Sequence, residues 1–333
     1  MAPKTLNDIL DAKTPEELFG RKEDPKRAQK RFTALLRLAH PDMNLKRSED
    51  AQKAFIIVNE MWHKFNGTTK AKANSVKTKR HEYTFEDKRY QADGVAYFEA
   101  TYDAGHEETI IAFSTTPAVN SLFTEATRNL RTIRRDVPDD YKAFFPEVVD
   151  IFSFQNGTNN TPAVALKGMN RMFSLREVLE DYPDGIDGKD VAWIFRRMLI
   201  ALGNTHDAGY IHGGANLDSF VIFPELHGLV LKDWQYSVPV GEPAKALAKK
   251  AKDIYPAYVF EGEPLKAELD IQMAASTALL LLEDAAPKRV RTFLKSLSQY
   301  PMKVAAEALY EFDEMLVDVY GGRKFHEFKM RRA

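Results

Sequence analysis

Residues 209–237 read GYIHGGANLDSFVIFPELHGLVLKDWQYS, and they decide the fold expected for the larger part of the chain. Upstream, residues 83–167 read mainly as short strands, including a hairpin that turns near Asp93-Gly94. Most of the remaining sequence up to residue 320 has helical periodicity. Strands first and helices afterwards predict an α+β arrangement, with a small antiparallel sheet lobe and a larger helical lobe.

The composition predicts a folded chain of about two domains. The chain has 333 residues, of which 44 % are apolar, so a sizeable core is available. It contains no cysteine, which excludes disulfides and thiolate metal sites. The N-terminal residues show no apolar signal-peptide core, and the longest apolar stretch, residues 271–282, is too short and too polar to span a bilayer. We therefore expect a cytoplasmic protein without a membrane partner.

The charges are distributed unevenly along the chain. Residues 1–82 carry 18 Lys and Arg against 11 Asp and Glu, whereas residues 83–333 carry 29 against 37. A basic head on an acidic body predicts two modules with different partners. The segment between them has no apolar periodicity and no aromatic residue to stack on bases, so we interpret it as a linker and disfavour nucleic acid as a partner. The expected division is 1–67 for a helical domain, 68–82 for a basic linker, 83–168 for the sheet lobe and 169–333 for the helical lobe.

Two amphipathic segments flank the tripeptide His40-Pro41-Asp42. Residues 25–39 combine an apolar stripe with five cations, and residues 48–65 repeat apolar side chains at helical spacing. Pro41 cannot continue a helix, so the chain turns there and leaves the tripeptide at an exposed tip. Two helices with facing apolar stripes and a short connection predict an antiparallel hairpin. The five cations are Lys26, Arg27, Lys30, Arg31 and Arg37.

This predicted hairpin resembles the J domain, the module that stimulates the ATPase of Hsp70-type chaperones. The sequence HPDMN at residues 40–44 is similar to HPDKN of that family, and Phe55, Asn59-Glu60 and Trp62 recur at the spacing of its third helix. The resemblance implies that the cations dock on an acidic surface of an Hsp70 (DnaK-type) partner and that the tripeptide triggers its ATPase. The simpler alternative is that the proline only ends a helix and the cations form a solvated surface.

Residues 209–237 resemble the catalytic loop, strand pair and metal-binding motif of protein kinases. In this resemblance His212 stands at the His of His-Arg-Asp, and Asp233 at the metal-binding Asp. Glu125 fits the Glu of the regulatory helix, and Asp270 fits the Asp that supports the catalytic loop. The resemblance implies a place for Mg²⁺ at Asp233 and, with it, for ATP. The residues alone also allow His212 to be a buried core histidine and Glu125 to be an ordinary surface charge.

Other positions depart from the kinase pattern. The resemblance places Gly214 at the catalytic base, Asn216 at the phosphate-steadying Lys, Ser219 at the second metal ligand, and Phe113 at the strand Lys that holds ATP phosphates. Lys167 follows Val-Ala-Leu much as the kinase Lys follows Val-Ala-Ile, but it lies too close to the catalytic-loop segment to take that role. Phosphoryl transfer depends on metals and a cationic clamp. We therefore predict a pseudokinase that is no enzyme, with no catalytic residue and no required cofactor.

The chain as a whole resembles a two-domain family of actinobacteria and their phages that joins a J-like domain to a kinase-like domain. The leading hypothesis is a non-enzymatic co-chaperone, in which the tripeptide recruits and stimulates DnaK and the kinase-like domain binds a protein client. One alternative is an atypical ATP-binding kinase or nucleotide transferase. A third hypothesis is a non-catalytic scaffold in which both domains are docking surfaces.

Overall fold

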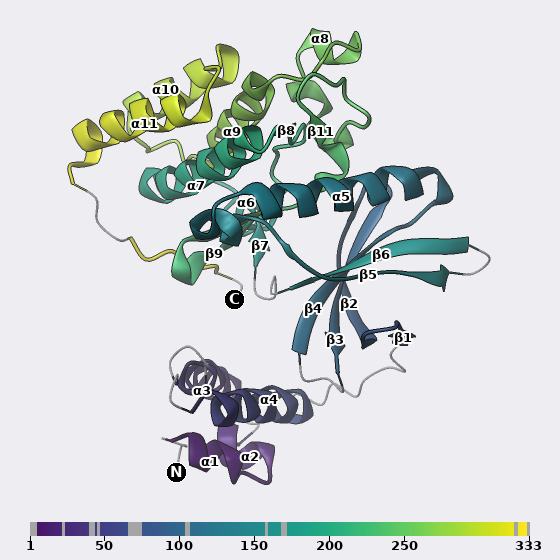
Figure 1. The fold of residues 1–333 in the computed structure, drawn as a ribbon. Coiled ribbons are helices and arrows are strands. Elements are labelled where there is room, and N and C mark those ends of the chain that lie inside the picture. The colour runs from purple at the N-terminus through teal and green to yellow at the C-terminus, as the bar shows by residue number, and fades with distance from the viewer. Residues whose placement is uncertain are drawn as a thin grey trace. The chain divides into compact units, whose positions relative to one another are not determined.

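The chain divides into two units in the computed structural model shown in Figure 1, Met1–Asn74 and Ser75–Ala333. The structure describes residues 5–21, 24–39, 44, 47–65, 75–103, 107–156, 159–167, 172–322 and 326–331.

The first unit is helical in its described residues. A capping box between Thr5 and Asp8 fixes the start of its first helix. Its core is mainly aliphatic, with a group of aromatic rings packed on it: the ring of Trp62 stacks on Phe32 at 4.5 Å between centroids and meets Phe19 edge-on at 5.0 Å. The two longer helices coincide with those predicted from the sequence, and their arrangement as a J-domain hairpin stays a prediction. The helices are α1 (Leu6–Leu10), α2 (Pro15–Phe19), α3 (Pro25–Leu38) and α4 (Ser48–Phe65).

The second unit begins with a six-stranded sheet in the order β1-β2-β3-β4-β6-β5, in which every neighbouring pair is antiparallel. Residues 75–77 form its first strand although the sequence placed them in a linker, because they pair with the edge of β2, Ser75 opposite Thr84 and Lys77 opposite Glu82. The strands are β1 (Ser75–Lys77), β2 (Glu82–Ala92), β3 (Val95–Tyr102), β4 (Glu107–Ser114), β5 (Glu147–Asn156) and β6 (Asn159–Lys167).

Helix α5 (Asn120–Asp136) crosses one face of this sheet (Figure 1). Side chains alternate between the faces of a strand. Ala112 of β4 therefore joins the core on the α5 side, which includes Tyr97 of β3 and Phe123 of α5. Its neighbour Phe113 packs on the opposite face, where its ring stacks on Phe98 at 5.4 Å. The expected small sheet lobe is thus confirmed.

The larger lobe is built mainly from helices. Helix α9 is apolar on nearly all sides, and it packs between α7 and α10, as expected of a helix inside a core. The helices are α6 (Leu175–Asp181), α7 (Gly188–Asp207), α8 (Ala257–Phe260), α9 (Ala267–Leu281), α10 (Lys288–Gln299) and α11 (Ala305–Tyr320), with a 3₁₀ turn, η6 (Trp234–Tyr236), and a second, η7 (Lys249–Ile254). Within the described ranges, no helix is long and apolar enough to cross a membrane.

Short strands hold the loops of this lobe in place. They are β7 (Phe173–Ser174), β9 (Phe220–Phe223) and β10 (Gly228–Leu231), which form one small sheet, and β8 (Tyr210–Ile211) with β11 (Val238–Pro239), which form another. The strand pair expected within residues 209–237 is β9 and β10, joined in register from Phe223–Gly228 to Phe220–Leu231.

Residues 326–331, the C-terminal strap, pack against the start of this lobe. Phe328 is buried, and its ring lies 5.7 Å from that of Tyr182. The Tyr182 hydroxyl donates a hydrogen bond of 2.6 Å to the carbonyl oxygen of Lys329. The strap therefore contributes both apolar burial and hydrogen bonds to the helical lobe.

Candidate functional site

The loop that follows β8 is held by a buried carboxylate from α9. Asp270 accepts hydrogen bonds from the backbone N–H groups of His212 and Gly213, both at 2.8 Å, and His206 Nε2 lies 2.9 Å from the same carboxylate. Burial alone would raise the pKa of Asp270, but the His206 hydrogen bond and the nearby histidine charges hold that pKa below its usual value. The structure thus joins two residues singled out in the sequence, His212 and Asp270, and adds His206.

His212 is fully buried beneath the loop. Its Nε2 lies 2.8 Å from the Lys232 carbonyl oxygen, which only accepts, so Nε2 carries the proton. Its Nδ1 then accepts from the Gly214 N–H at 3.3 Å. Burial lowers the pKa of His212, which favours this neutral form. The histidine acts here as a hydrogen-bonded core residue that ties the loop to β10.

The three loop positions that depart from the kinase pattern are Gly214, Asn216 and Ser219, and their contacts are with the chain itself. A Cβ on Gly214 would lie 2.3 Å from Cδ2 of Tyr236, so no side chain fits there without a shift. The Ser219 hydroxyl donates to the Gly214 carbonyl, and Asn216 Nδ2 donates to the same oxygen at 2.9 Å. These contacts shape the loop.

Asp233 lies directly after β10 with a left-handed backbone, φ 65° and ψ 46°. That conformation is uncommon for a residue other than glycine and marks candidate functional positions. The carboxylate is buried, and its Oδ2 accepts from Lys232 Nζ at 3.0 Å. The Lys232 ammonium also lies 3.9 Å from the ring centroid of Tyr90 and 4.8 Å from that of Tyr97. A buried cation, two aromatic faces and one carboxylate thus form a single cluster.

The Asp233 carboxylate in this cluster is the candidate ligand for a metal cation. Asp233 Oδ1 is buried and, among the described residues, has no hydrogen-bond donor of ordinary geometry, although hydrogen bonding between the Tyr97 hydroxyl and this carboxylate contributes to the raised pKa of Tyr97. An unpaired carboxylate oxygen fits a hard cation such as Mg²⁺. The Lys232 ammonium, which is bonded to Oδ2, competes with a metal cation for the negative charge of the Asp233 carboxylate. Across the described ranges, no group of three or more His, Asp or Glu residues is arranged to hold a metal.

Three tyrosines lie near the cluster, Tyr90 and Tyr97 on the sheet side and Tyr236 on the helical-lobe side. Burial, and next to it the charge of Asp233, raises the pKa of Tyr90, of Tyr97 and of Tyr236 above the ordinary range. All three rings therefore stay neutral at physiological pH.

Three residues of the sheet lobe were singled out in the sequence, and the structure gives the contacts of each. Phe113 faces away from α5, so the position of β4 that faces the helix is Ala112, which also has no charge to offer a phosphate. Glu125 of α5 is ion-paired with Lys245 of the helical lobe. Lys167 is exposed at the end of β6, opposite Thr109 and away from the cluster around Asp233.

A second buried carboxylate near the loop was missed by the sequence interpretation. Asp218 accepts two hydrogen bonds from Arg176 of α6, at 2.5 and 2.8 Å, and Lys250 Nζ lies 3.6 Å from it. Bidentate pairing of this kind is among the stronger charged contacts. Nothing local in the sequence signals it, because Arg176 and Asp218 lie 42 residues apart.

The predicted chaperone-binding residues lie on the first unit. His40, Pro41 and Asp42 fall outside the described residues. Lys26, Arg27, Lys30 and Arg37 are exposed on α3, and Arg31 is partly exposed. The side of α3 that packs inward carries buried apolar residues such as Leu35. Among the described residues of this unit, none of the five cations forms an ion pair.

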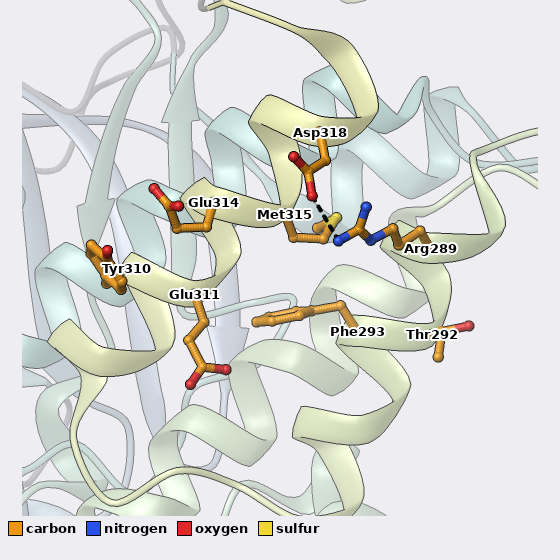
Figure 2. Close-up of a pocket in the computed structure, with 8 residues that line it drawn as sticks. All are labelled: Arg289, Thr292, Phe293, Tyr310, Glu311, Glu314, Met315 and Asp318. Carbon is orange, nitrogen blue, oxygen red and sulfur yellow. Dashed lines mark ion pairs between the residues drawn. The ribbon is translucent and has the colours of Figure 1, made fainter.

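A hollow of about 400 Å³ lies between α10 and α11 (Figure 2). Phe293 and Met315 form its apolar part, and Arg289 is ion-paired with Asp318 at 2.9 Å across one end. None of the candidate site residues lines it. The hollow is therefore separate from the cluster around Asp233.

The curled antiparallel sheet, the helix across it and the helical lobe with its carboxylate-supported loop together define a protein-kinase-like fold. Among the solved structures that match is that of vaccinia related kinase 3, with a TM-score of 0.57 and 12 % sequence identity. The match covers 78 % of this chain and 96 % of that one. At this identity the likeness shows the fold alone. No model of a known protein family matches the chain, and no curated protein matches its sequence.

This finding corrects one expectation from the sequence. The prediction that the chain is no enzyme is wrong as a conclusion, because the matching structure is that of a kinase. The prediction rested on the residue types at four positions, and a shared fold does not say which other side chains supply charge. Lys232, which the sequence interpretation passed over, places a buried ammonium beside Asp233.

Proposed function

We propose that the chain is a co-chaperone: its N-terminal unit recruits and stimulates an Hsp70-type ATPase, and its kinase-like unit binds a protein client. The observation that carries the proposal is the set of mostly exposed cations on α3, which have no ion-pair partner among the described residues, while the other side of the helix packs into the apolar core. The resemblance of His40-Pro41-Asp42 and its flanks to a J domain indicates an Hsp70-type chaperone as the partner.

The charges define how such an encounter would work. Exposed cations on one helix steer an acidic partner and set its orientation, and they affect the association rate more than the final affinity. The tripeptide then supplies the specific contact. Loss of the tripeptide and loss of the cations should therefore have separable effects.

The test is the steady-state ATPase rate of a DnaK-type chaperone with the full chain added. We expect stimulation by the wild type, none by His40→Gln, and a higher half-saturating concentration for Lys30→Glu. Lys53→Glu, which reverses an exposed cation on α4, is the matched control and should behave as wild type. Equal stimulation by the wild type and His40→Gln would sink the proposal.

A second function, nucleotide binding by the kinase-like unit, is favoured by one specific observation. Asp233 is buried and has a left-handed backbone, and its Oδ1 has no hydrogen-bond donor of ordinary geometry among the described residues. Mg²⁺ commonly binds through one or two carboxylates together with substrate phosphates. We expect ATP with Mg²⁺ to raise the thermal midpoint of the full chain and Asp233→Asn to abolish that shift. Radiolabelled ATP in the same samples reports phosphoryl transfer. No shift with either Mg²⁺ or Mn²⁺ would reject this second function.

A further inference from the structure

The turn between β2 and β3 bridges the two lobes of the kinase-like unit. Asp93 and Gly94 form this turn, both with positive φ, 48° and 84°. Asp93 Oδ2 accepts hydrogen bonds from the Tyr236 hydroxyl at 2.7 Å and from the Lys249 backbone N–H at 3.1 Å. Both donors belong to the helical lobe. A hairpin tip of the sheet lobe is thus bonded to the segment that follows Asp233.

These bonds are sheltered from water. The Asp93 side chain is only 15 % exposed, and Tyr236 is buried. Hydrogen bonds to a carboxylate in such a place are stronger than those between neutral groups in water. Lys249 Nζ, at 3.8 Å from Asp93 Oδ1, adds a weaker attraction because its own side chain is exposed.

Beneath the turn, the space around Asp233 is filled by the chain itself. The Lys232 ammonium occupies one oxygen of the carboxylate, and the rings of Tyr90 and Tyr97 lie against that ammonium. Tyr90 belongs to β2 and Tyr97 to β3, the two strands that the Asp93 turn connects. While Asp93 is hydrogen-bonded to Tyr236, the two strands therefore hold the rings of Tyr90 and Tyr97 against Lys232.

A phosphate-bearing ligand meets two obstacles in this arrangement. Its metal cation competes with the ammonium for the Asp233 carboxylate, and its bulk needs the space that the tyrosines fill. Both obstacles are removed if the β2–β3 hairpin lifts away from the helical lobe. For this to happen the bonds at Asp93 have to break at the tip, and the rings of Tyr90 and Tyr97 have to leave Lys232.

We propose that Asp93, Tyr236 and Lys249 form a latch that holds the kinase-like unit in an autoinhibited, closed state, with Lys232 as the internal substitute for a ligand's cation. The proposal rests on the nucleotide-binding function above, which it extends to regulation. A partner that pulls on the hairpin, or that captures the segment around Lys249, would open the site. The latch sets the ratio of closed to open molecules. Because only the open molecules bind nucleotide, the observed affinity is the intrinsic affinity multiplied by the open fraction.

The experiment uses the full chain and two variants that release the latch. Tyr236→Phe removes only the hydroxyl donor and keeps the ring that packs on Gly214. Asp93→Gly removes the carboxylate, and glycine accepts the positive φ of the turn without strain. Asp103→Gly is the matched control, because Asp103 also has a positive φ of 52° but bonds to His81 within the sheet lobe.

Two readouts are measured on every variant: amide hydrogen exchange of β2 and β3, and the dissociation constant for MgATP by calorimetry. We expect both latch variants to exchange faster at β2 and β3 and to bind MgATP about tenfold more tightly, the size expected for losing one sheltered hydrogen bond. The control should match wild type in both. Lys232→Met should likewise tighten binding, since it frees the Asp233 carboxylate.

The outcomes separate the two proposals. Unchanged exchange in both latch variants would overturn the latch, even if the wild type binds nucleotide. Faster exchange with no nucleotide binding in any variant supports the latch and rejects the nucleotide-binding function. Weaker MgATP binding by Lys232→Met would overturn the part given to Lys232, because it would show that the ammonium holds the ligand rather than replacing its cation.

Discussion

Lysines occur in two opposite settings in this molecule. Those of α3 are exposed and, among the described residues, have no ion-pair partner, whereas Lys232 is buried, ion-paired with Asp233 and covered by two tyrosine rings. The first setting leaves charge available for a partner, and the second consumes it inside the fold. The comparison shows that a cation's sequence position says little about its role until its neighbours are known. Four predictions test or refine this contrast.

The largest effect is expected at Asp270, the buried carboxylate that holds the loop after β8. Asp270→Ala leaves two buried backbone N–H groups and His206 without their acceptor. Loss of such a buried, charged acceptor should lower the free energy of unfolding by roughly 5 kcal/mol. Urea denaturation of the full chain measures it. Asp284→Ala, at a fully exposed carboxylate, is the control and should show no measurable change.

Lys232→Met tests the buried cation itself. Removing one partner of a buried ion pair should destabilise the kinase-like unit by about 3–5 kcal/mol, because it leaves the Asp233 carboxylate uncompensated. Adding Asp233→Asn to the same chain removes that charge and should restore a large part of the lost stability. A double variant no more stable than the single one contradicts the proposed pairing. Lys30→Met on α3 should leave the denaturation midpoint unchanged.

The buried histidine predicts a pH dependence. The pKa of His212 is lowered by burial, so the folded state binds its proton at a lower pH than the unfolded state, whose value is about 6.5. The stability that the neutral ring contributes is present above that pH and is lost as pH falls through the window toward the folded pKa. The slope from this site is at most about 1.4 kcal/mol per pH unit. His212→Gln should flatten the dependence of urea midpoints measured between about pH 7.5 and 5.5.

The smallest effect is expected on α3. Reversal of Lys30 and Arg37 to Glu should leave stability unchanged, because both side chains are exposed. It should instead weaken the salt dependence of chaperone stimulation, since screening acts on exposed charges. ATPase titrations at about 50 and 300 mM salt compare the two chains. Identical salt dependence would show that these cations take no part in the encounter.

Periodicity and order predicted much of the fold. The helical lobe expected over residues 169–333 contains helices α6 to α11, and the strand pair that the kinase resemblance implied inside 209–237 is β9 and β10. Strands followed by helices correctly indicated a sheet lobe and a helical lobe. Residues 75–77 were missed because a three-residue edge strand has too few positions to show a pattern.

The site was predicted only in part, for two physical reasons. The resemblance placed Phe113 at the strand-Lys position, whereas Ala112 faces α5, because a shift of one position in a strand exchanges the faces and the sequence does not fix that register. Lys232 and Asp93 were passed over because their roles depend on contacts with residues far away in the chain, such as Tyr90 and Tyr236. His212, Asp233 and Asp270 were found because each belongs to a short local motif.

The C-terminal strap has a consequence for the order in which the protein is built. Its Arg331 backbone N–H bonds to Asp181, a residue made 150 positions earlier. During synthesis, the surface of α6 and α7 that receives Phe328 is therefore without its cover until the strap leaves the ribosome. Domains tend to fold as units while the chain emerges from its N-terminus. The helical lobe can thus complete its packing only after residues 326–331 have emerged, well after the sheet lobe has all its strands.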